Sequence, residues 1–193
     1  MARIILASAS LRRKELLESA GIVVEVRASD IAEVGYGGDP AHLPLRMAKQ
    51  KVKSVRAALG PSFDGWILGA DTVVALQKET FGKPHDEKDA RRMLERLSGR
   101  EHTVYTGFRV EGFDGDFREG TVATVVEFAP MTSSEIDTYI RSGEPFDKAG
   151  AYAIQGKGGR FVRAIRGSYS NVVGLPLFEV IQALRELGAI KDT

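Results

Sequence analysis

Two adjacent arginines stand near the amino terminus, where a helix is predicted to begin. In the segment 3–21, RIILASASLRRKELLESAG, a short apolar run is followed by small residues and then by Arg12 and Arg13. The first N–H groups of a helix have no partner within the helix, so acidic side chains are usual there. A strand, a small turn and a helix start form an anion cradle to which arginines add donors matched to phosphate oxygens. The segment predicts either such a cradle or a solvated helix face with arginines paired to Glu15 and Glu18.

A carboxylate follows a second apolar run. Asp71 comes directly after the strand predicted over 66–70, and ligand crevices of open α/β sheets lie at the carboxyl ends of strands. The residue is therefore placed for chemistry, although an Asp that caps a turn fits equally well. Glu33, in the predicted loop 29–38, is a candidate second carboxylate, but acidic loop residues are mostly solvated. Mg²⁺ needs only one or two carboxylates beside phosphate oxygens, so this pair would suffice.

Lysines and glycines supply further candidates. Lys83 stands between Gly and Pro, in a backbone fixed enough to aim its side chain. Lys49, Lys51 and Lys53 fall on a predicted helix, and most of them are expected to face solvent. The Gly-rich segment 144–175 contains Tyr, Gln, Lys and Arg and would suit either a pocket for a base or sugar or a strand–turn–strand.

Composition excludes several classes of protein. Lys plus Arg number 27 against 26 Asp plus Glu, a balance that argues against a nucleic-acid-coating protein. Cysteine is absent, so there is no disulfide, thiolate nucleophile or cysteine-bound zinc. His42, His85 and His102 lack metal-ligand spacing and are expected at the surface or at caps, and no glycine motif has dinucleotide or Walker spacing. No signal peptide or membrane segment is recognised, which predicts a cytoplasmic protein.

Strands and helices alternate along the chain. Strands are expected over 4–7, 22–27 and 66–70 with 72–76 extended, strand-like patches over 151–154 and 161–165, a hairpin of 103–112 with 121–130 around FDGD, and helices over 11–20, 40–59, 86–97, 132–142 and 176–187. With 193 residues of which 43% are apolar, the chain can bury one sizeable core. The prediction is a single α/β domain over 1–193 with a large antiparallel component.

Several motifs in order resemble one known family. They are LASASLRRKELL, ADTVV, GKP, YTG, FDKAGAYAIQGKGGRFV and GSYSNVVGLPL, spread from Leu6 to Leu177. In this order and spacing the chain resembles the Maf family of nucleoside triphosphate pyrophosphatases. The resemblance implies a mixed α/β fold with two lobes around a deep cleft, related to the inosine triphosphate pyrophosphatases. It also implies cleavage of a nucleotide to the monophosphate and pyrophosphate with a divalent cation, Mg²⁺, Mn²⁺ or Co²⁺.

The same resemblance implies roles for particular residues. Asp71 is similar to the catalytic base, Glu33 to a second metal-associated acid, and Lys83 to a phosphate-binding residue of the catalytic set. The substrate-binding residues implied are Ser8, Arg12, Arg13, Lys51, Thr72 and Gln155. Of these, Arg12, Thr72 and Gln155 match positions tied to substrate choice. The form AYAIQGKG is similar to the subgroup that acts on dTTP and UTP, as opposed to 7-methyl-GTP.

Two positions depart from the family pattern. Leu11 stands where Pro is frequent, which affects the helix entry, and Ala32 precedes Glu33 where an acid is common, which concerns a second metal contact. The resemblance also implies a homodimer with a house-cleaning role in nucleotide metabolism. Two alternatives remain: a regulator of septum formation that binds nucleotide without hydrolysis, and a nucleotidyltransferase that needs an acceptor.

Overall fold

A mixed β-sheet forms the centre of the protein, seen here in a computed structural model that describes residues 3–29, 31 and 38–191. In this part of the chain the sheet has seven strands in the order β2-β1-β3-β5-β6-β7, with β4 paired to β3. The strands are β1 Ile4–Leu6, β2 Glu25–Val26, β3 Trp66–Leu76, β4 Glu79–Phe81, β5 Glu101–Glu111, β6 Phe117–Phe128 and β7 Val162–Arg166. β1 runs parallel to β2 and β3, and the other pairs are antiparallel.

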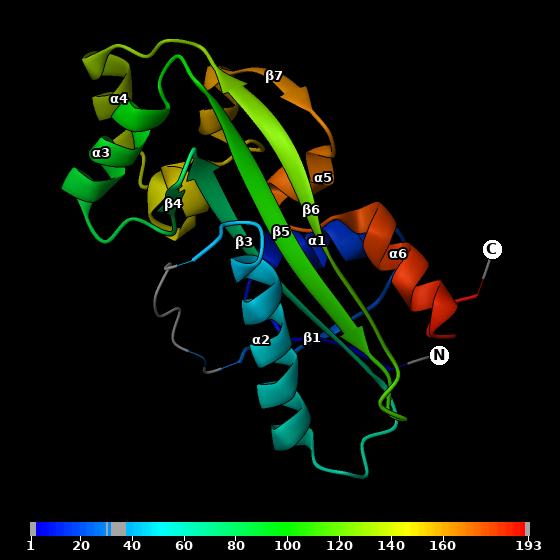
Figure 1. Ribbon diagram of the computed structural model, residues 1–193. Helices are drawn as coiled ribbons and strands as arrows, with labels where there is room; N and C mark the ends of the chain where they lie inside the picture. The colour runs from blue at the N-terminus through cyan, green and yellow to red at the C-terminus, as the bar shows by residue number, and fades with distance from the viewer. Residues whose placement is uncertain (1–2, 30, 32–37, 192–193) are drawn as a thin grey trace.

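Helices lie on both faces of the sheet. They are α1 Leu11–Ser19, α2 Leu43–Leu59, α3 Glu87–Leu97, α4 Ser133–Ile140, α5 Tyr169–Val173 and α6 Leu177–Glu186, with 3-10 helices at Glu144–Asp147, Ala149–Ala151 and Lys157–Phe161. Figure 1 shows α2 in front of the long strands, α6 on their other side, and α3 with α4 at one end. None of the helices in the described ranges is long and apolar enough to cross a membrane.

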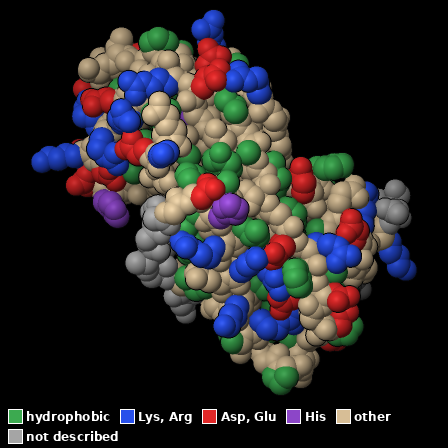
Figure 2. Space-filling view, in the orientation of Figure 1, with side chains coloured by type: hydrophobic (Ala, Val, Ile, Leu, Met, Phe, Trp, Pro, Cys, Tyr) green, Lys and Arg blue, Asp and Glu red, His purple; other side chains and the backbone are tan. Residues whose placement is uncertain are grey.

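Alternation along β1 explains the two covered faces. Ile4 and Leu6 belong to the apolar cluster of α1 and α6, whereas Ile5 packs with Val52 of α2. A second large cluster joins α3 and α4 to the far ends of the long strands. The buried side chains therefore form two lobes joined by continuous strands, which confirms the predicted mixed α/β class. On the face shown in Figure 2, basic and acidic side chains are interspersed.

Two glycines let α2 lie close to the sheet. A Cβ at Gly107 would come within 2.2 Å of the Leu45 backbone nitrogen, and one at Gly69 within 2.6 Å of the Ala48 carbonyl oxygen. Any larger residue would push the helix outward. The close approach brings the buried side of α2 onto the middle of β3.

Most predicted elements are confirmed. The hairpin pairs Glu111 with Phe117 beside its turn, and the helix predicted from 132 begins with a complete capping box between Thr132 and Glu135. The strand predicted over 22–27 was too long, because only Glu25–Val26 pairs with β1.

One other boundary and one expected strand were wrong. The helix predicted from 40 begins at Leu43, after a turn. The patch 151–154 is not a strand, because positive φ angles at Gly150 and Ala151 turn the chain there.

Candidate active site

The site lies where one edge of β3 loses its neighbours. β1 pairs with β3 as far as Leu68, and β4 pairs with the same edge from Val74 onward. Within the described residues, no strand pairs with the edge between these two positions, so Asp71 and Thr72 lie in a gap. Asp71 is in the middle of an 11-residue strand, opposite Gly107 of β5. The expectation that Asp71 follows a strand end was therefore wrong, since the strand continues through the polar pair.

Alternation along β3 sends these two side chains to opposite faces. Asp71 points toward α2, where its Oδ1 accepts a hydrogen bond of 2.6 Å from Lys51 Nζ. Thr72 points toward the face of α1 and α5, where its hydroxyl oxygen accepts a bond of 3.1 Å from Arg13 Nη2. The site therefore extends around the open edge of the strand and uses helices from both sides.

Lys51 is buried with its partner. The side chains of Lys51 and Asp71 are only 8% and 9% exposed. Lys51 lies on the buried side of α2, together with Met47, Ala48 and Val55. Lys49 and Lys53 are exposed, as expected for most lysines of this helix, and Lys51 is the buried exception. The sequence signal for this burial was the position of Lys51 within the apolar stripe of the helix. An isolated buried charge is costly, so a lysine at such a position indicates a buried partner.

The buried Arg13 side chain connects three segments of the chain. Its guanidinium donates to Ser8 Oγ at 2.7 Å and to the Gly174 carbonyl at 2.8 Å, besides Thr72. These partners belong to the turn after β1, to the end of α5 and to β3. The solvated-face interpretation is therefore wrong for Arg13, because its contacts assemble the wall of the site.

Arg12 is more exposed and faces the site with the start of α1. Its side chain is 28% exposed and lies 3.6 Å from the carboxylate of Asp147. Burial lowers the pKa of Arg12, and the charge of Asp147 opposes this effect. Ser10 at the N-cap position makes no side-chain cap bond, and the first turn of α1 has no acidic residue. The positive end of the helix is thus not neutralised by its own sequence.

A cavity of about 360 Å³ collects the predicted residues. Its lining includes Ser8, Arg12, Arg13, Lys51, Asp71, Thr72, Lys83 and Gln155. Lys83 and Gln155 are exposed residues of this lining. Glu33, the predicted second acid, lies outside the described residues. The structure therefore brings together eight of the nine predicted site residues.

The cavity also has lining residues that sequence reasoning missed, among them Asp147, Lys148 and Tyr152. The Tyr152 hydroxyl lies 2.9 Å from Nε2 of His102. His102 is only 2% exposed, so the expectation of a surface or capping role was wrong for this histidine. Burial lowers the pKa of His102 to about 4. The signal in the sequence was its place in the alternating pattern of β5.

Comparison with known proteins identifies the family. A sequence model of the family described as Maf-like protein matches residues 3–187. The chain belongs to the Maf family. One Maf relative, the dTTP/UTP pyrophosphatase of Geobacter sulfurreducens, is 49% identical over 193 residues, which covers 97% of this chain and 98% of the relative. The dTTP/UTP pyrophosphatase of Geotalea uraniireducens is 50% identical, with 97% and 96% covered.

Solved structures give a more distant similarity. The Ham1 protein of Staphylococcus aureus is 14% identical, with a TM-score of 0.47 over 96% of this chain and 99% of that chain.

Proposed function

We propose that this Maf protein hydrolyses dTTP and UTP to the monophosphate and pyrophosphate. The observation that carries the proposal is the buried Lys51–Asp71 pair in one cavity with Arg12, Arg13 and the start of α1. The relatives named dTTP/UTP pyrophosphatase, 49% and 50% identical over nearly the whole chain, support this choice of substrates.

The charge of the cavity suits a polyphosphate. Arg12, Arg13, Lys51 and Lys83 contribute basic groups, and the start of α1 contributes backbone N–H groups. Guanidinium groups bind phosphate oxygens in pairs, and lysines supply compact charges. Such groups stabilise the negative charge that grows on the leaving pyrophosphate in the transition state.

Asp71 is the proposed general base. Its carboxylate accepts a proton from a water whose oxygen forms a bond to the α-phosphorus. The bond between that phosphorus and the bridging oxygen breaks, and pyrophosphate leaves with the electron pair. Lys51 holds one oxygen of Asp71 at 2.6 Å and so fixes the direction in which the carboxylate points.

A divalent cation fits the donor groups of the cavity. Within the described part of the chain, no three His, Asp or Glu side chains form a metal cluster, and the acidic residues lining the cavity are Asp71 and Asp147. One or two carboxylates suffice for Mg²⁺ when phosphate oxygens complete the coordination. We propose Asp71 and Glu33 as the protein ligands of Mg²⁺, Mn²⁺ or Co²⁺. When bound, the cation would neutralise phosphate charge.

Substrate choice is proposed for Arg12, Thr72 and Gln155. The Thr72 hydroxyl also lies 2.9 Å from Thr106 Oγ1, so its position is fixed from two sides. Gln155 is an exposed residue of the cavity lining, where an amide can pair with a base. We further propose that residues 1–193 act as one unit, in a cytoplasmic homodimer that clears pyrimidine nucleotides.

Pyrophosphate release tests the proposal. The purified protein with Mg²⁺ or Mn²⁺ is assayed on dTTP, UTP, CTP and purine triphosphates, and turnover is expected to be fastest with dTTP and UTP. Asp71→Asn is expected to lower kcat about 10²- to 10⁴-fold, because a positioned base contributes that much. The matched control is Glu119→Gln, an ion-paired acid outside the cavity lining.

Three results would contradict the proposal. Nucleotide binding without release of pyrophosphate would favour a regulator, and more than a tenth of the wild-type kcat in Asp71→Asn would remove the base assignment. Turnover that requires an acceptor other than water would favour a nucleotidyltransferase.

A further inference from the structure

We infer that Lys148 is a further polyphosphate-binding side chain, and that Asp147 holds Lys148 and Arg12 until an anion displaces it. The inference rests on the proposed function, since a polyphosphate must enter this cavity. Both residues line the cavity, and neither was among the residues predicted from the sequence.

The pair lines the cavity beside the first turn of α1. Asp147 ends the 3-10 helix Glu144–Asp147, and Lys148 connects it to the 3-10 helix Ala149–Ala151. One oxygen of Asp147 accepts a hydrogen bond from Lys148, and the other lies 3.6 Å from Arg12 Nη1. A single carboxylate therefore joins cations from two segments that are distant in the sequence.

The backbone that carries Lys148 is held in place from both sides. On one side, the Gly150 N–H donates to the Gly82 carbonyl at 3.0 Å, and a Cβ at Gly150 would come within 2.9 Å of the Val74 side chain. On the other side, the Glu144 carboxylate accepts bonds from the N–H groups of Lys157 and Gly158 at 2.9 and 3.0 Å. Lys148 therefore projects from a fixed point.

The Lys148 and Asp147 side chains differ in exposure, as displacement of Asp147 by an anion requires. The Lys148 side chain is 13% exposed, whereas that of Asp147 is 72% exposed. Burial works against the charged form of Asp147, but the hydrogen bond from Lys148 and the charges of Lys148 and Arg12 together outweigh it and lower the pKa of this carboxyl. Asp147 is thus a charged group held at the surface, and exposed ion pairs contribute little to stability.

A polyphosphate would compete well for the same cations. It offers several charged oxygens where Asp147 offers two, and Arg12 can bind phosphate oxygens in a bidentate manner. When the anion enters, Asp147 can move into solvent without losing a buried position. Lys148 and Arg12 would then both bind the polyphosphate.

Titration of the whole protein with inorganic pyrophosphate tests this inference. Binding is measured by calorimetry in EDTA, so that metal coordination by Asp147 plays no part. Lys148→Gln is expected to weaken pyrophosphate binding about tenfold, the effect of losing one hydrogen bond to a charged group. Asp147→Asn is expected to strengthen binding about threefold, since an exposed ion pair no longer competes. The control is Asp137→Asn, which removes the same charge from an ion pair with Arg91 outside the cavity lining.

The outcomes separate this inference from the proposed function. Wild-type affinity in Lys148→Gln, or weaker binding in Asp147→Asn, would overturn the inference even if dTTP is hydrolysed. The expected affinity changes without any hydrolysis of dTTP would support this anion site and contradict the proposed function. Because Asp147→Asn is expected to gain affinity, misfolding cannot imitate the result.

Discussion

Lys49 and Lys51 stand two residues apart on α2 and form ion pairs of nearly the same length in different surroundings. Lys49 Nζ lies 2.7 Å from Glu119 with its side chain 45% exposed, whereas Lys51 Nζ lies 2.6 Å from Asp71 with its side chain 8% exposed. The distances alone do not distinguish the two pairs. Burial does, because a desolvated charge depends far more on its partner than a solvated one does.

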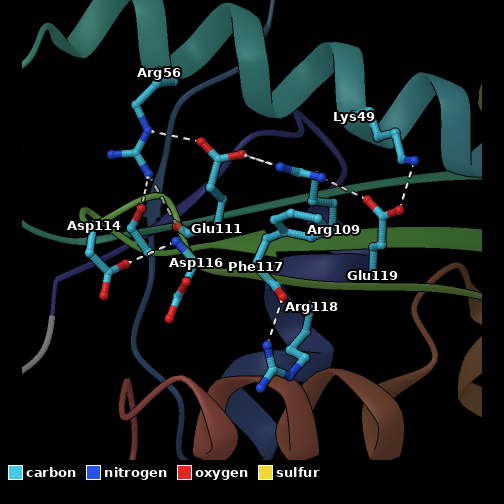
Figure 3. A network of polar contacts seen from close by, with 10 residues as sticks. Lys49, Arg56, Arg109, Glu111, Asp114, Asp116, Phe117, Arg118 and Glu119 are labelled. Carbon is cyan, nitrogen blue, oxygen red and sulfur yellow. Dashed lines mark hydrogen bonds and ion pairs between the residues drawn. The ribbon is translucent and has the colours of Figure 1, made fainter.

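The two regions also differ in how their charges are balanced. In the network that joins α2 to the β5–β6 hairpin, Glu119 binds Lys49 and Arg109, and Glu111 binds Arg109 and Arg56 (Figure 3). The Arg109 guanidinium also lies 3.8 Å from the centre of the Phe117 ring.

In that network Glu111 and Glu119 each lie between two cations. Around the cavity, among the described lining residues, basic side chains outnumber the acidic ones, which are Asp71 and Asp147. The first region can satisfy its own charges, and the second is suited to an added anion.

Removal of the buried lysine gives the largest expected change in stability. Lys51→Met should lower the free energy of unfolding by about 3–5 kcal/mol, because it leaves the Asp71 carboxylate buried without its partner. The measurement is urea denaturation at pH 7, followed by circular dichroism.

The matched control is Lys49→Met, on the same helix and with the same change of side chain. Its effect should stay below about 1 kcal/mol, as for other exposed ion pairs. Equal losses in the two variants would contradict the contrast between the regions.

A pH titration tests the effect of burial on a second ionisable group, His102, whose ring contacts Tyr152 of the cavity lining. Its pKa is about 4 in the folded protein, below the ordinary 6.5, so the unfolded chain binds the proton more readily between these values. Stability is therefore retained above pH 6.5 and falls as the pH decreases toward 4, by about 3 kcal/mol in total.

His102→Gln should lack this part of the pH dependence. The free energy of unfolding is measured from pH 7 to 4 for both proteins, and the curves should converge as the pH falls. Parallel curves would show that His102 does not titrate as its burial requires.

Local rules predicted much of the fold. The capping box at Thr132 and the FDGD turn are set by neighbouring residues, so their elements were confirmed. The limits of β2 and the length of β3 depend on partners distant in sequence. Asp71 and Thr72 interrupt an apolar run, but pairing with β5 carries the strand through them.

The site was also predictable only in part, because some of its contacts join residues that are distant in the sequence. Motifs in order brought Ser8, Arg12 and Asp71 to attention, and the structure gathers them in one cavity. The contacts of Arg13 with Gly174 join residues 161 positions apart, which no local pattern reveals. Lys148 was missed because a lysine in a Gly-rich segment has no periodicity that indicates its direction.

Transfer of oxygen from labelled water tests the central claim most directly. The protein is allowed to hydrolyse dTTP with Mg²⁺ in H₂¹⁸O, and the masses of both products are measured by mass spectrometry. Water that attacks the α-phosphorus under the control of Asp71 places one ¹⁸O in dTMP and none in pyrophosphate. Label found in pyrophosphate would mean attack on the β-phosphorus and would contradict the account.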